Sequence, residues 1–312
     1  MKTLQYATIL VVLGIGGILC AFPACAGVWY VDKAAPPGGD GTAWSTAFTE
    51  IQPAIGAAYN DGGGEVWIRA GVYDENRTGL YGSLTLRNGV SLYGGFDGME
   101  DRREERDWVK QETVIDGSTA WGGAQADRVV YGTRINNVAI DGFVVRNGLS
   151  SGITLSSEGQ ATIANCLITK IGAWPGSGIS ISGEDACIHN VRFIENAGAA
   201  LHISQGTILV ANCFFFQNGA GVEAGSSDLL MMDCEFIENA SALYLFSGGR
   251  FERCTFHRNT GRYGGAVSYV RYTVGDPRIF INCVFAENYS FHTEGNPNPS
   301  SGRGGAVLYT AS

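Results

Sequence analysis

The sequence is poor in charged residues, and poorest in basic ones. Only 16% of its 312 residues are Asp, Glu, Lys or Arg, and 21 Lys and Arg stand against 30 Asp and Glu, for a formal net charge of −9. Proteins that bind nucleic acids concentrate Lys and Arg to neutralise phosphates, and no such cluster is visible. We therefore expect no nucleic-acid partner.

Other patterns are missing too. The eight cysteines form no CxxC or Cys/His spacing, so we predict no metal centre. After the N-terminus no apolar run is long enough to span a bilayer. Disorder is excluded because 45% of the residues are apolar and 11% aromatic. What is abundant is glycine, at 45 residues without the Gly-X-Y period of collagen, which indicates many turns.

Residues 1–26 have the features of a secretory signal peptide. Lys2 precedes an apolar run from Ala7 to Leu19, and Ala24-Cys25-Ala26 fits the small-x-small pattern before a cleavage at Gly27. A retained anchor and a lipoprotein signal are the alternatives. Cleavage would leave no transmembrane span, so we expect a chain that is secreted or held at the cell surface or outer membrane.

A self-similar segment returns along the second half of the chain at intervals of 20 to 29 residues. Each copy has a polar residue, then Cys or Val, and two residues later an aliphatic or Phe side chain. From the second copy onward an Asn follows three residues after the Phe. The copies begin at Asn165, Asn190, Asn212, Asp233, Arg253 and Asn282. The asparagines are Asn196, Asn218, Asn239, Asn259 and Asn288.

The other half of each unit is two small residues and an aliphatic one, as in Ser177-Gly178-Ile179. Apolar and polar residues alternate within the units, which is the period of a strand with one buried face. So short a unit cannot bury that face alone, whereas stacking on its copies builds a continuous core. The strict period of six of left-handed helices and the Leu ladder of leucine-rich repeats are both missing. We predict an all-β, right-handed parallel β-helix.

A short helix is expected to cover the open N-terminal end of this solenoid. Thr49 to Tyr59 has amphipathic spacing, and Thr49 with Gln52 suggests a capping box. The predicted organisation is a signal peptide at 1–26, a cap segment at 27–64 and β-helix repeats at 65–312.

The repeats resemble those of a known family. Phe-x-x-Asn, as at Phe236 to Asn239, and Gly-Gly-Ala-Val, as at Gly264 to Val267, are similar to the repeats of the polymorphic outer membrane proteins, which are secreted surface β-helices that act as adhesins. The run from Trp29 to Tyr73 resembles the opening of bacterial pectin-lyase-like β-helix proteins. The resemblance implies the fold but not an activity, since the fold hosts lyases, hydrolases, epimerases and non-catalytic adhesins.

The sequence also differs from the polymorphic outer membrane proteins. No outer-membrane barrel follows, and the sequence stops inside a coil after Gly304-Gly305-Ala306-Val307. A solenoid normally ends in a cap, so we expect a chain that is truncated at its C-terminus.

Two ladders of equivalent residues are predicted to be structural. Cysteines recur at one repeat position that Val191 fills in the remaining copy, which indicates an inward apolar slot. Stacked neighbours lie at the strand spacing, wider than a disulfide prefers, so we expect inert thiols, with bridges as the alternative. The asparagines suit left-handed corners and can bond from coil to coil. The cysteines are Cys166, Cys213, Cys234, Cys254 and Cys283.

The candidate site follows one residue after each small-small-aliphatic triplet, where side chains point outward. His202, Glu223 and Tyr244 recur at intervals of 21 residues and should lie on consecutive coils. A His or Tyr base beside a carboxylate could abstract a proton from a uronic acid, but a lyase also needs Arg, Lys or Ca²⁺ for the substrate carboxylate. The predicted ligand-binding column is Thr154, Ser180, His202, Glu223, Tyr244 and Ser268.

Two loops interrupt the period, Asp97 to Trp108 and Tyr289 to Arg303. Such loops either recognise partners or are solvated insertions. The Asp32 to Asp40 loop could hold Ca²⁺ or simply turn the chain; no other cofactor is expected.

We expect a non-catalytic scaffold that adheres to, or contacts, polysaccharides or molecules on host or neighbouring cell surfaces. A polysaccharide lyase or other carbohydrate-active enzyme is one alternative. A structural spacer within a larger surface protein is another.

Overall fold

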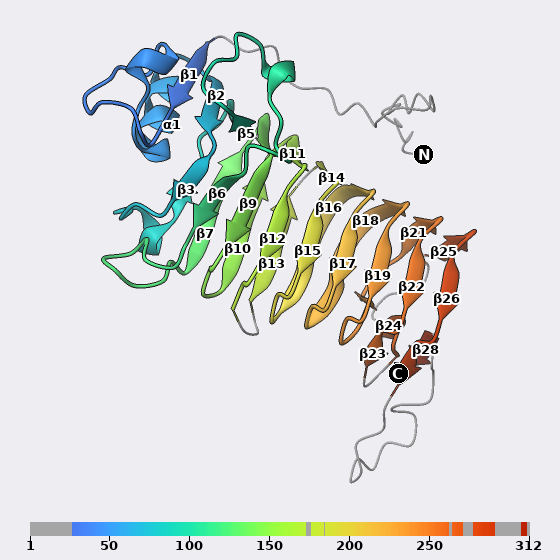
Figure 1. Ribbon diagram of the computed structural model, residues 1–312. Helices are drawn as coiled ribbons and strands as arrows, with labels where there is room; N and C mark the ends of the chain where they lie inside the picture. Colours follow the sequence, from blue (N-terminus) through green and yellow to red (C-terminus); the bar gives the residue numbers. More distant parts are fainter. Residues whose placement is uncertain are drawn as a thin grey trace, which may run out of the picture.

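Parallel strands wind the chain into a solenoid in the computed structural model, with the coils stacked from the blue to the red end (Figure 1). The structure describes residues 27–172, 176–183, 185–261, 264–270, 277–290 and 307–310. Every strand pair between coils is parallel, as in β13 with β16. The prediction of an all-β parallel β-helix with a short N-terminal helix is confirmed. The predicted signal peptide lies outside the described residues.

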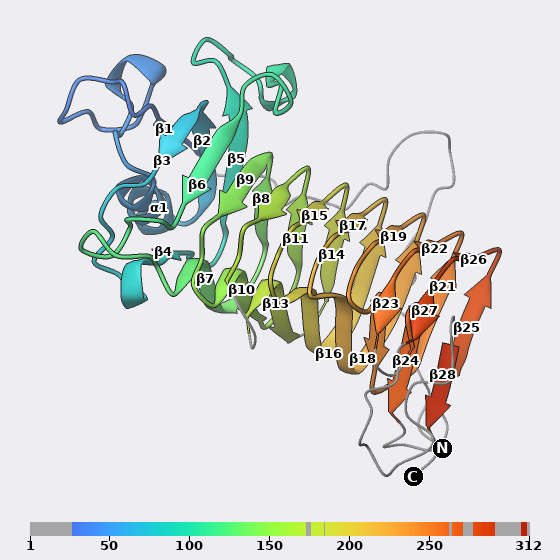
Figure 2. The ribbon, with the colours of Figure 1, turned by 60° about the horizontal axis from the view of Figure 1, so that its bottom comes forward.

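Three faces run the length of the stack, and Figure 2 shows the first along its lower side. Face 1 consists of β4 (Leu84–Thr85), β7 (Arg128–Ile135), β10 (Ser151–Ser157), β13 (Ser177–Gly183), the first parts of β16 (Ala199–Ala211) and β18 (Ala220–Met232), β20 (Leu243–Leu245), β24 (Val267–Val270) and β28 (Val307–Thr310).

Face 2 follows each strand of face 1 around a corner. It consists of β1 (Val28–Val31), β2 (Gly64–Arg69), β5 (Val90–Phe96), β8 (Val138–Asp141), β11 (Ala161–Ala164), β14 (Ala186–His189), the second parts of β16 and β18, β21 (Gly249–Glu252) and β25 (Arg278–Ile281).

Face 3 closes each coil. It consists of β3 (Gly71–Tyr73), β6 (Thr113–Asp116), β9 (Phe143–Arg146), β12 (Leu167–Thr169), β15 (Arg192–Ile194), β17 (Phe214–Phe216), β19 (Glu235–Ile237), β22 (Thr255–His257) and β26 (Val284–Ala286). A short pair, β23 (Thr260–Gly261) with β27 (Tyr289–Ser290), lies beside it.

One column of the core is a stack of identical side chains. The repeat phenylalanines point inward from face 3, and successive ring centroids lie 4.4 to 4.9 Å apart with planes within 11° of parallel. This spacing matches the distance between paired strands, so each Phe ring stacks on the ring of the next coil. The stack consists of Phe193, Phe215, Phe236, Phe256 and Phe285.

The asparagine ladder pins one coil to the next. Asn239 Nδ2 donates to Asn259 Oδ1 at 3.0 Å and to the Phe215 carbonyl at 2.9 Å, while its Oδ1 accepts from the backbone N–H and the Nδ2 of Asn218. The same bonds recur along the ladder. The predicted coil-to-coil amide bonds are confirmed, and the four ladder asparagines from Asn196 to Asn259 are at most 3% exposed.

The predicted reason for the ladder asparagines was wrong in one respect. The left-handed backbone belongs to the residue before each of them, with φ between 53° and 56° at Glu195, Gln217, Glu238, Arg258 and Glu287. Asparagine does adopt the left-handed conformation at the other short corner, before the cysteine, as at Asn165 and Asn212.

The five ladder cysteines are free thiols. Four of them are at most 3% exposed, and Cys213 Sγ, for example, lies 3.3 Å from the Ala211 carbonyl oxygen. Burial raises the pKa of the Cys166 thiol to about 12. A thiol that stays protonated is a poor nucleophile and metal ligand, so these residues serve packing.

The N-terminal cap contains α1 (Ile51–Asn60), with the 3₁₀ turn η1 (Trp44–Thr46) before it. Its fully buried side chains, Ile51, Ala54, Ile55 and Ala58, pack over the first coil, as expected. The capping box is wrong, because Glu50 is the N-cap and makes no side-chain bond. The Gln52 side chain instead pairs with the backbone of Thr85, at 2.7 and 3.1 Å, and joins the helix to face 1.

The charged segment from Asp97 to Trp108 is partly exposed, as a solvated insertion would be, but it also packs against the solenoid. It carries the 3₁₀ turn η3 (Arg103–Glu105) and docks on the outside of face 2. Arg106 Nη2 lies 2.7 Å from Asp141 Oδ2, with both side chains 6% exposed, and Arg103 pairs with Glu65. Both guanidinium groups lie over the ring of Tyr93.

The other interrupting loop, Tyr289 to Arg303, is described only through Ser290. Within the described residues, no helix is long and apolar enough to cross a membrane.

Candidate functional site

The predicted column is a single register position on face 1. Pairing runs from Thr154 to Ser180, His202, Glu223, Tyr244, Ser268 and then Leu308 on successive strands. The residues on either side of each member point inward, as Leu201 and Ile203 do beside His202, and both are fully buried. Strand alternation therefore sends the whole column outward.

The centre of the column is a contact between two ionisable groups. His202 Nδ1 lies 3.5 Å from Glu223 Oε2, with the side chains 44% and 27% exposed. Both groups keep open surface and remain free to accept or donate further hydrogen bonds. Tyr244 on the next strand packs edge-on against Phe246, with ring centroids 4.8 Å apart.

Ser268 is a correction to the predicted set. It stands at the column position but is only 3% exposed, one strand away from the much larger Tyr244. A hydroxyl with so little accessible area adds almost nothing to the outward surface of face 1, so we remove Ser268 from the candidate site.

The structure extends the column toward the N-terminus. Tyr131 on β7 pairs with Thr154, and Thr85 on β4 pairs with Tyr131. The Arg128 guanidinium lies 5.4 Å from the centre of the Tyr131 ring. Sequence reasoning missed these residues because the first coils do not carry the repeat motif, and only strand pairing reveals their register.

A second outward row was also missed. Thr133, Ser156 and Ser182 pair with one another two residues beyond the column. Together the two rows make face 1 a surface of hydroxyl groups with one imidazole and one carboxylate, bordered by Tyr131 at one end and Tyr244 at the other. Five strand spacings separate these tyrosines, which is roughly 24 Å.

The carboxylates of Asp32 and Asp40, at the two ends of the predicted loop, already have partners in the fold. Asp32 Oδ2 pairs with Arg69 Nη1 at 2.7 Å, and Asp40 Oδ1 accepts bonds from Thr42 and Thr46. The hydrogen bonds from Thr46 and Thr42 lower the pKa of Asp40 to about 2. Among the described residues, no group of three or more His, Cys, Asp or Glu could hold a metal ion.

Known proteins share this architecture. The family model described as "Right handed beta helix region" matches residues 128–291. Among solved structures, pectate lyase Pel9A is similar with a TM-score of 0.56 at 13% identity, over 89% of this chain and 82% of that one. At such identity the likeness shows the fold alone.

Two further solved structures match with TM-scores of 0.48. A pectin methylesterase from Aspergillus niger is 11% identical, over 94% of this chain and 93% of that one. A rhamnogalacturonan lyase is 12% identical, over 81% of this chain and 86% of that one. No curated protein sequence matches the chain.

Proposed function

This chain belongs to the right-handed β-helix family, and we propose that it is an exported, non-catalytic scaffold that binds polysaccharide along the outward column of face 1. The observation that carries the proposal is the unbroken register from Tyr131 to Tyr244. A repeating polymer and a repeating protein surface can meet many times with the same geometry.

The side chains of the column match the chemistry of sugars. Hydroxyl groups of Thr154 and Ser180 both donate and accept hydrogen bonds, and Glu223 accepts them from sugar hydroxyls. Tyr131 and Tyr244 offer flat apolar rings, on which the C–H faces of a pyranose can pack. A pectate lyase has the same fold, which supports a polysaccharide as the class of ligand.

Binding fits these residues better than cleavage. Glu223 beside His202 could serve as a base, but the column supplies one carboxylate and no Lys or Arg of its own. Arg128, which lies against Tyr131, is three strands away from His202 and too far to stabilise the charge of a uronate transition state there. The signal-like residues 1–26 and the family resemblance of the repeats support export and contact with cell-surface glycans of a host or neighbouring cell.

The proposal is tested with affinity electrophoresis and calorimetry of the purified chain against a panel of soluble plant, microbial and animal polysaccharides. His202→Ala/Glu223→Gln should weaken binding of the recognised polymer about tenfold, since two polar contacts are lost. The matched control is His257→Ala/Glu287→Gln, because His257 Nε2 and Glu287 Oε2 are also 3.5 Å apart but lie away from face 1. Equal loss in both double variants, or no binding across the panel, would reject the proposal.

A further inference from the structure

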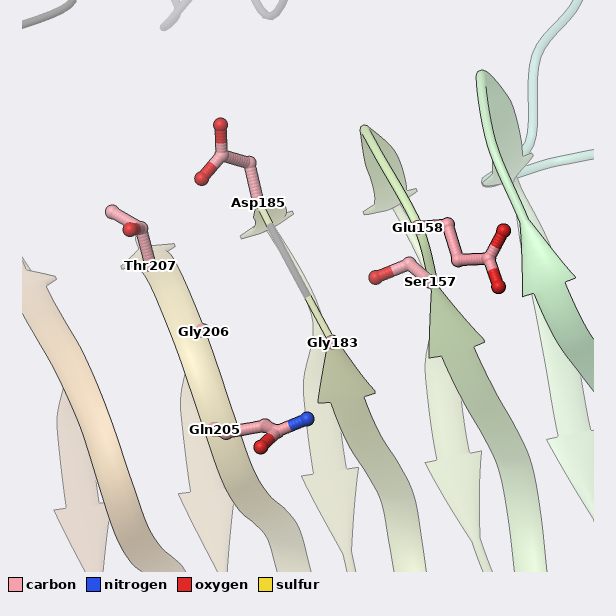
Figure 3. Close-up of a pocket in the computed structure, with 7 residues that line it drawn as sticks. All are labelled: Ser157, Glu158, Gly183, Asp185, Gln205, Gly206 and Thr207. Atoms are coloured by element: carbon pink, nitrogen blue, oxygen red, sulfur yellow. The ribbon is translucent and has the colours of Figure 1, made fainter.

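A polar pocket lies at the corner between face 1 and face 2, away from the column. Its volume is about 560 Å³, and it spans three successive coils where β10, β13 and β16 leave face 1. Figure 3 shows the residues around it. They are Ser157, Glu158, Gly183, Asp185, Gln205, Gly206 and Thr207.

Ser157 forms the buried part of the pocket. Its residue is 4% exposed, and its Oγ has no hydrogen-bond partner among the described residues. Figure 3 shows the hydroxyl directed from β10 toward the strand that carries Gly183. A hydroxyl buried without a partner loses hydration that nothing replaces, so such a group points to a ligand that completes it.

Gly183 lets the strand that carries it approach Ser157 closely. It has a φ of 133°, and a Cβ there would lie 2.0 Å from the Ser157 carbonyl oxygen and 2.8 Å from its Oγ. Gly206 on the next coil, with a φ of 111°, likewise has no side chain. The backbone at this corner of the pocket therefore tolerates no side chain at Gly183, because a Cβ would collide with Ser157.

The walls are hydrophilic and negatively charged. Gln205 and Thr207 can both donate and accept hydrogen bonds, whereas Glu158 and Asp185 only accept them when ionised. None of the seven lining residues is basic or aromatic. Two carboxylates at the rim repel an acidic sugar and attract a cation.

From this lining we propose that the corner pocket binds a protonated amino sugar. The pocket is open to solvent along most of its surface, and its volume is far larger than a bare metal ion requires. Hydroxyl, amide and carboxylate groups are the partners that a sugar ring uses, and the two carboxylates add a preference for an ammonium group. The site is separate from the polysaccharide column, and its residues do not overlap with it.

The test uses calorimetry and saturation-transfer NMR on the purified chain with three matched monosaccharides. Glucosamine carries a positive charge, N-acetylglucosamine is neutral and galacturonic acid is negative. We expect glucosamine to bind best, with an affinity that falls as salt is added. Equal binding of glucosamine and N-acetylglucosamine, or preferred binding of galacturonic acid, would overturn the proposal.

Two variants identify the site. Glu158→Gln/Asp185→Asn should weaken glucosamine binding roughly fivefold, because both charges lie at a solvated rim. Ser157→Ala should also weaken binding while leaving the melting temperature unchanged or higher, since the deleted hydroxyl has no partner in the fold. A purely structural Ser157 would instead lower the melting temperature without affecting the sugar.

The control is Glu235→Gln, an exposed carboxylate on face 3. Unchanged glucosamine affinity in both pocket variants would refute the assignment, as would Ca²⁺ that binds through the same residues and excludes the sugar. The column variant His202→Ala/Glu223→Gln should keep its glucosamine affinity, so failure of this site and failure of the polysaccharide proposal are distinguishable.

Discussion

The regular coils from β10 to β22 and the first coils from β1 to β8 hold together by different means. In the regular coils one residue type repeats at one position and meets its own copy, as Phe215 meets Phe236 and Asn218 meets Asn239. In the first coils unlike partners meet once, as Arg106 meets Asp141 and Trp67 stacks on Phe96 at 4.8 Å. The stability of the repeats should therefore depend on side-chain packing and amide hydrogen bonds. The stability of the first coils should depend on ion pairs.

The largest expected effect is in the repeat core. Phe236 is fully buried between two other rings, and Phe236→Ala should lower the free energy of unfolding by about 4 kcal/mol through the cavity it leaves. Urea denaturation measures the loss. Phe214→Ala is the matched control, because this ring is half-buried on the outside of face 3, and it should cost well under half as much. Equal losses would show that the stacked rings are not the core.

The next effect distinguishes the two regions. Arg106→Met leaves Asp141 charged and buried without its partner, which should cost about 3 kcal/mol. Loss of this ion pair should unfold the structure only locally. Hydrogen exchange and proteolysis should therefore accelerate in residues 97–112 while β15 to β22 stay protected. Arg102→Ala, at a side chain that is 73% exposed, should change neither. Uniform acceleration along the chain would contradict an independent cap.

The ladder amides come next. Asn239→Ala removes bonds to Asn259 and Phe215 and leaves a carbonyl and an amide without partners, so we expect a loss of about 2 kcal/mol. Chemical denaturation gives the value. Glu235→Ala on the surface of the same coil is the control and should be neutral. A neutral Asn239→Ala would mean that strand pairing alone fixes the coils.

The smallest effect is a pH dependence in the first coils. Burial alone would raise the pKa of Asp116, but bonds from Asn147, Ser118 and Arg146 outweigh it and lower the pKa to about 2. A carboxyl whose pKa is lower in the folded protein stabilises the fold at any pH above its pKa in the unfolded chain. This contribution is lost as the pH falls toward the pKa of the folded state. Between neutral pH and pH ~3 the loss should be about 1 kcal/mol. Acid titrations of stability should show this slope, and Asp116→Asn should remove it.

The sequence predicts the regular coils well and the first coils poorly. The repeats predict the parallel β-helix, the inward Phe and Cys positions and the face 1 column, because a period of side chains directly encodes a register. The repeats do not predict the position of Tyr131, because it lies in a coil without the motif. They also do not predict the docking of Arg106, because it depends on one partner 35 residues away. The corner pocket also escapes prediction, since its lining comes from the ends of three strands rather than from a motif.

The central claim is that polysaccharide lies along face 1. Hydroxyl-radical footprinting of the chain, free and saturated with its polysaccharide, reads the accessibility of individual side chains. We predict that oxidation of Tyr131, His202 and Tyr244 falls on binding while that of His257 on face 3 and Tyr59 on the cap is unchanged. Protection of His257 with no change at His202 and Tyr244 would contradict the account.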